Sequence, residues 1–99
     1  MDQAYFGTEL KYLVEITASG FSMINDDFNI LLKRGSTTHL FQKDDLVRDG
    51  DDFYLCFDSA EFGKGPITVV ITAYVPDTDF DDGLRTEVYK FDLVTTLGV

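Results

Sequence analysis

The chain has 99 residues, of which 44% are apolar, and it contains nine Phe and five Tyr. This length allows one core, since single domains are built from about 50 to 200 residues, and the apolar content excludes a disordered chain. Eighteen acidic residues against eight basic ones give a net charge of -10, which disfavours binding to nucleic-acid phosphates and favours a basic protein surface or a divalent cation as partner.

Period-two alternation of apolar and polar residues recurs through the sequence, which is typical of half-buried strands. The first strand is predicted over residues 10–16, with Leu10, Tyr12, Val14 and Ile16 on one face. Turn residues at 18–20 and 25–27 then separate it from a second strand over residues 28–35, in which Phe28, Ile30 and Leu32 share a face. A third strand is expected over residues 37–42, followed by a polar corner over residues 44–52.

The second half of the chain begins with Phe53, Leu55 and Phe57, which are expected to point inward. Residues 58–62 carry capping side chains and predict one short helical turn. The longest strand follows over residues 67–74 and stops at Pro76, and a loop over residues 77–83 joins it to a last strand over residues 86–94.

This pattern predicts an all-β fold with about six to seven strands, either an antiparallel β-sandwich or a small barrel. We expect a single domain over residues 1–99, with residues 1–8 flexible and residues 95–99 either flexible or docked on a neighbour. Cys56 has no partner for an intrachain disulfide, and its neighbours Phe53–Phe57 predict that it is buried and inert. No signal peptide and no membrane span is recognised, so we expect a chain that folds in the cytoplasm.

The acidic loop after the longest strand is the first candidate site. Asp77, Asp79 and Asp81 are spaced like the start of a calcium loop, with Glu87 downstream. In an EF-hand register, however, residue 82 would be Gly and residue 88 would be Glu, whereas the chain has Asp82 and Val88. The alternative is a solvated hairpin loop without metal.

Other candidates for chemistry are weaker. Carboxylates gather at Asp44, Asp45, Asp49, Asp51 and Asp52, but their turn-like segment lacks the apolar pocket that a catalytic acid requires. His39, the one histidine, is expected at a sheet surface, and no hydrolase, zinc or phosphate-loop motif accompanies it. The sequence therefore predicts no catalytic residue and no cofactor, and we expect that the chain is not an enzyme.

Aromatic side chains are the remaining candidates for binding. Phe80 stands in the acidic loop between Asp79 and Asp81, where its ring either folds back or meets a partner. Rings exposed on a sandwich could also stack on sugars, so a carbohydrate-binding module and a calcium-stabilised adhesive domain stay open as alternatives.

Several stretches of the chain resemble small structural proteins of tailed bacteriophages and prophages. They are Asp27–Gly35, Lys43–Leu46 and Tyr54–Asp58, and in the second half Thr72–Phe80 and Asp82–Val88. The resemblance implies an immunoglobulin-like β-sandwich that serves as a non-enzymatic module of a virus particle, at the tail, baseplate or capsid surface. It implies other virion proteins as partners in a homo- or hetero-oligomer, a location in the virion, and no role for nucleic acid or membrane. In that setting Phe80, Arg85 and Asp82 are predicted to lie at an interface, together with exposed strand edges.

Overall fold

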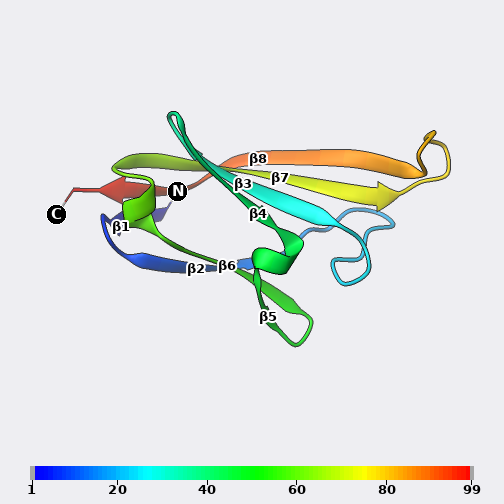
Figure 1. Cartoon of the computed structure of the whole chain (residues 1–99), viewed down its shortest axis with the longest axis horizontal. Coiled ribbons are helices and arrows are strands. Elements are labelled where there is room, and N and C mark those ends of the chain that lie inside the picture. Colours follow the sequence, from blue (N-terminus) through cyan, green and yellow to red (C-terminus); the bar gives the residue numbers. More distant parts are fainter. Residues whose placement is uncertain (1, 99) are drawn as a thin grey trace.

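In the computed structural model, which describes residues 2–98, the alternating stretches of the sequence form the strands of two packed sheets (Figure 1). Sheet A has the strand order β1-β8-β7-β3-β4, and sheet B has the order β2-β6-β5. All neighbouring strands are antiparallel except β1 and β8, which are parallel. The strands are β1 (Asp2–Tyr5), β2 (Glu9–Val14), β3 (Phe28–Arg34), β4 (Thr37–Gln42), β5 (Val47–Asp49), β6 (Asp52–Asp58), β7 (Gly65–Pro76) and β8 (Leu84–Leu97).

The expected all-β class is confirmed, but the described residues form eight strands rather than six or seven. The two extra strands are β1 and β5. All three side chains of β5 are exposed, so its sequence carries no alternation that could reveal it. The predicted helical turn is confirmed as a 3-10 turn at Ser59–Glu61, where the Asp58 carboxylate accepts a hydrogen bond from the Ala60 amide. A second 3-10 turn, Lys43–Asp45, was not expected.

The core lies between the two sheets and is built from the predicted inward faces. Phe28 of sheet A meets Phe53 of sheet B edge to face, with 5.6 Å between their ring centroids. Phe57 and Phe62 form a second edge-to-face pair at 5.5 Å. Such pairs add to the burial of their area, so they help to hold the sheets together. The other most deeply buried side chains are Ile30, Leu32, Ile67, Val69, Val75 and Val94.

A buried hydroxyl fixes the point at which the chain passes from sheet A to sheet B. Ser59, which is 0% exposed, donates a hydrogen bond to the Tyr5 carbonyl and accepts one from the Gly7 amide. Its own amide donates to the Thr8 carbonyl. The 3-10 turn after β6 therefore holds the β1–β2 connection in place.

The β7–β8 hairpin is the longest element, and its far end extends past the other strands (Figure 1). Part of its inner face is covered by the loop that follows β2. The loop packs Gly20 near Val75, and the Asp27 carbonyl accepts a hydrogen bond from the Tyr74 amide. Between this loop and β1, no described strand covers the inner face of β8.

Candidate interaction site

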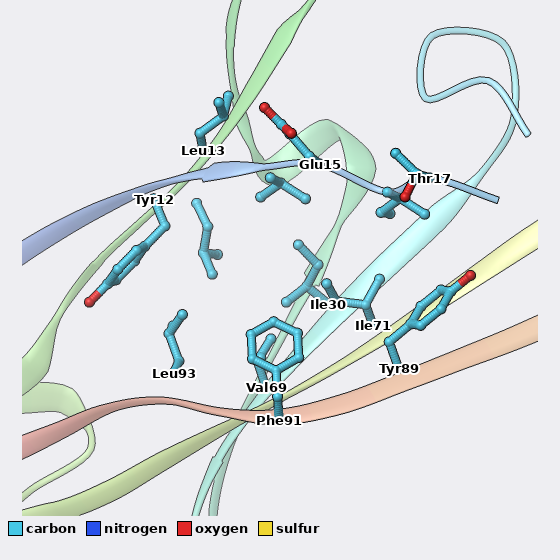
Figure 2. A pocket seen from close by; sticks show the side chains of 13 residues that line it. Tyr12, Leu13, Glu15, Thr17, Ile30, Val69, Ile71, Tyr89, Phe91 and Leu93 are labelled. Carbon is cyan, nitrogen blue, oxygen red and sulfur yellow. The ribbon is translucent and has the colours of Figure 1, made fainter. Parts of the chain in front are cut away.

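An open apolar groove lies between strand β2 of sheet B and strand β8 of sheet A (Figure 2). Its volume is about 460 Å³. Tyr89, Phe91 and Leu93 rise into it from β8, and Tyr12 of β2 lines its opposite side. The remaining lining residues are Leu13, Val14, Glu15, Ile16 and Thr17 on the β2 side, and Ile30, Leu55, Val69 and Ile71 on the floor.

The groove exists because the two sheets differ in width. Three strands of sheet B cannot cover five strands of sheet A, and β8 lies beyond the edge of sheet B. The register places Tyr89 opposite Ile71 and Phe91 opposite Val69. Directly paired residues share a face, so these two rings lie on the inner, core-facing side of sheet A. Phe91 nevertheless stays 47% exposed, because no strand stands over it in residues 2–98.

Free strand edges border the groove on both sides. Strand β2 pairs with β6 alone, so its other edge has no neighbour among the described strands. Strand β1 pairs only with Val94–Leu97 of β8, which leaves Leu84–Leu93 unpaired on that edge in residues 2–98. Such edges present free backbone N–H and C=O groups, and these can pair with an incoming strand.

A polar network continues from the groove along the inner face of the hairpin. The Tyr89 hydroxyl donates to Glu87, and Arg85 donates to Glu87 at 3.2 Å and to Asp77. Hydrogen bonds from the Asp79 amide and from Arg85 lower the pKa of Asp77 below its usual value of 3.8. Burial beside the groove and the charge of Glu87 raise the pKa of Tyr89 above 10.0. At neutral pH Asp77 is therefore charged, and its ion pair with Arg85 links the two strands of the hairpin.

The predicted interface residues fall at the end of this hairpin in different roles. Phe80 is 48% exposed at the tip, so its ring does not fold back into cover. Asp82 accepts a hydrogen bond from the Leu84 amide, and Arg85 is held by Asp77, Glu87 and the Ser19 carbonyl. Phe80 is thus the member of the three that is free to meet a partner.

The candidate calcium residues do not converge. Arg85 lies between Asp77 and Glu87 and is hydrogen bonded to both, while Asp79 and Asp81 point to solvent at the loop. Over residues 2–98, no three His, Cys, Asp or Glu side chains come together as a set that could hold a metal ion.

The other residues singled out from the sequence lie at the surface. The five carboxylates of the polar corner are all exposed, and Asp45 accepts a hydrogen bond from the Gln42 amide. The ring of His39 packs on Phe62, with 4.8 Å between centroids. The prediction for Cys56 is wrong: it pairs with Lys11 on the outer face of sheet B and is exposed.

Sequence reasoning did not find the groove. The alternation of Tyr89, Phe91 and Leu93 was visible as an apolar face. What it could not reveal is that this face lies beyond the edge of the opposing sheet, because strand order is set by contacts between distant segments. No helix within residues 2–98 is long and apolar enough to cross a membrane.

Comparison with known proteins adds no further assignment. No protein-family model matches the chain, and no curated protein or solved structure shows significant similarity to it. We therefore base the proposed function on the groove, the hairpin and the charge of the chain, and its setting on the sequence resemblance.

Proposed function

We propose that this chain is a non-enzymatic assembly module that contacts other proteins through the β7–β8 hairpin and the groove beside it. One observation carries the proposal: two large aromatic rings of the hairpin remain exposed, one at its tip and one on its inner face. Phe80 at the tip is 48% exposed, and Phe91, which pairs with Val69, is 47% exposed. Apolar and aromatic side chains that gather on one element in this way are typical of protein contact surfaces.

The strand order supports an immunoglobulin-like architecture for this module. In chain order, β2 to β8 occupy the places of strands B, C, C′, D, E, F and G, with B-E-D in one sheet and C′-C-F-G in the other. Strand β1 lies beside β8 and thus beside the G position. Sandwiches of this kind serve many unrelated functions, so the architecture supports a module and leaves its role to the surface.

A tailed-bacteriophage particle is the setting that we propose for the module, on the strength of the sequence resemblance. The surface is compatible with it, since the hairpin tip and the free strand edges are elements through which repeated subunits contact neighbours. The chain would then be a tail, baseplate or capsid-surface component that meets other virion proteins.

The two most exposed rings, Tyr5 and Phe80, lie too far apart to serve together in the carbohydrate alternative. Tyr5 pairs with Leu97 at one end of β8, and Phe80 lies beyond Leu84 at the other end. Fourteen residues of extended strand separate these ends by about 45 Å, so the two rings cannot form one stacking platform for a sugar chain.

The test is incorporation of the chain into particles made by the genome that encodes it. Mass spectrometry of purified particles should detect the chain, and Phe80→Ala should lower the amount that is incorporated. Val47→Ala is a matched control, because Val47 is also 48% exposed but lies on β5 of sheet B. Particles that assemble without the chain, or incorporate the Phe80→Ala and Arg85→Ala variants normally, would refute the proposal.

A further inference from the structure

We propose that the groove is an acceptor site for a β-strand from another protein, and that the incoming segment is basic with alternating apolar residues. This inference rests on the proposed contact function and names the chemistry of the partner. It places the new strand beside β2, where it adds a fourth strand to sheet B and covers the exposed inner face of β8.

The size and lining of the groove fit an extended backbone. Strand β2 is six residues long, about 20 Å of strand, and it is an edge of sheet B among the described strands. Its last residues and the three that follow, Glu15–Thr17, line the groove. A strand paired to this edge stands over Tyr89, Phe91 and Leu93, the residues that sheet B leaves uncovered. Every second side chain of such a strand points into the groove, and those side chains must be apolar to match the lining.

The charges decide what the other side chains should be. Glu9 and Lys11 of β2, and Glu15 just after it, are exposed on the outward side. The Lys11 ammonium lies over the Tyr54 ring of β6, away from the outer edge of the sheet, which leaves Glu9 and Glu15 as the charges beside that edge. Glu15 is also the charged member among the described residues that line the groove. In Figure 2 the carboxylate of Glu15 points away from sheet A, toward the side on which the outward residues of an added strand would lie. Lys or Arg at these positions complements the carboxylates and the net charge of -10.

The same charge argues against a second copy of this chain as the occupant. Two copies would bring together two bodies that each carry a net charge of -10. The inserted segment would also have to come from a strand that is already paired within its own chain, because eight strands take up most of residues 2–98. A basic segment of a different protein avoids both costs.

The experiment is a binding titration of the full chain with a panel of fluorescein-labelled ten-residue peptides. In the test peptides Val or Ile alternates with Lys. Three matched sets of controls carry Glu in place of Lys, the same residues in two blocks instead of alternating, or N-methyl groups on every second amide. We expect saturable binding of the alternating basic peptides and much weaker binding of all three controls.

Variants of the chain locate the binding site. Phe91→Lys should weaken binding by about tenfold or more, because it places a cation in the apolar groove. Val88→Lys is the control, since Val88 lies on the same strand but pairs with Thr72 on the outer face. Glu15→Lys should weaken binding of the basic peptide by about two- to fivefold and strengthen binding of the acidic one, as expected for an exposed ion pair. Melting curves of all three variants verify that they fold.

Amide chemical shifts complete the test, and the expected changes lie in β2 and in the part of β8 that faces it. Failure of the whole alternating panel to bind, or binding that survives Phe91→Lys and shifts other strands, would overturn the strand-acceptor site. Self-association that Phe91→Lys abolishes would replace the basic segment by a second copy. If the peptides do not bind but particle incorporation still depends on Phe80, the contact function stands without the acceptor site. If the peptides bind but incorporation does not depend on Phe80, the acceptor site stands without the contact function.

Discussion

Replacing Phe91 by Ala should cost the isolated chain far less stability than the same replacement at Phe28. Phe28 is 0% exposed and packs against the rings of Phe53 in sheet B and Phe21 in the loop after β2, whereas Phe91 is 47% exposed at the open side of the groove. Complete burial of a Phe side chain stabilises a fold by about 1.5–3 kcal/mol, so the half-buried Phe91 contributes about 1 kcal/mol. Its removal leaves no closed cavity, since the site already opens to water.

At Phe28 the same change removes a fully buried ring and leaves a cavity between the sheets, and such substitutions cost about 3–5 kcal/mol. Urea denaturation followed by circular dichroism measures both values, with similar slopes expected for the two variants. For a domain of this size, the loss at Phe91 corresponds to a decrease in Tm of about 4–8 °C. If Phe28→Ala leaves the chain unfolded, its cost exceeds the stability of the parent and the expected order still holds.

A cost at Phe91 equal to that at Phe28 would refute the reasoning. It would mean that the groove closes over Phe91 in the free chain, in which case neither the exposed ring nor the free β2 edge would be available to a partner. A cost near 1 kcal/mol, together with weaker peptide binding by the same variant, would mean that the ring serves binding more than folding.

Four further predictions concern three single polar groups and the binding of calcium. Ser59→Ala should destabilise the chain by about 1–2 kcal/mol in urea denaturation, because the fully buried Ser59 hydroxyl loses its hydrogen bonds with the Gly7 amide and the Tyr5 carbonyl. An unchanged midpoint would contradict this. Thr96→Val should stabilise the chain by about 1 kcal/mol, since the buried Thr96 hydroxyl has no hydrogen-bond partner within residues 2–98, and a lower Tm would show that it has one. Asp77→Asn should lower the Tm at neutral pH. The difference in Tm between the variant and the parent should vanish as the pH falls below 3.8 and through the lowered pKa of Asp77, because the folded carboxylate then loses its charge. A difference in Tm that persists in acid would exclude the ion pair with Arg85 as its cause. Calcium should leave the Tm unchanged, since Arg85 already engages two of the candidate ligands, and a Tm that rises with the ion would restore the adhesive-domain alternative.

The faces of the long strands could be predicted from the sequence because one side of each is buried. Phe28, Ile30 and Leu32 lie inward as expected, and so do Phe53 and Leu55. The same alternation places Cys56 outward, between Leu55 and Phe57. The error at Cys56 came from judging the residue by its usual preference for burial, whereas the period of two is the stronger constraint in a strand.

Short strands and strand order could not be predicted in this way. Strand β1 is four residues long and β5 is three, and pairing of the backbone rather than an apolar face defines β5. The groove depends on which strands stand side by side, and the parallel pairing of β1 with the end of β8 joins residues that are more than ninety positions apart. Phe80 was the part of the candidate site that local sequence could indicate, since a ring among carboxylates at a loop tip is an unusual pattern.

The most direct test of the contact function is hydrogen–deuterium exchange of the chain, measured free and in the assembled particle. We expect slower exchange in the particle over β2 and over Leu84–Leu93, because the edge strands become paired there. Protection of the hairpin alone would support the contact function without strand addition. Protection confined to β4 and β5, or unchanged exchange along β2 and the hairpin, would contradict contact through the hairpin and the groove.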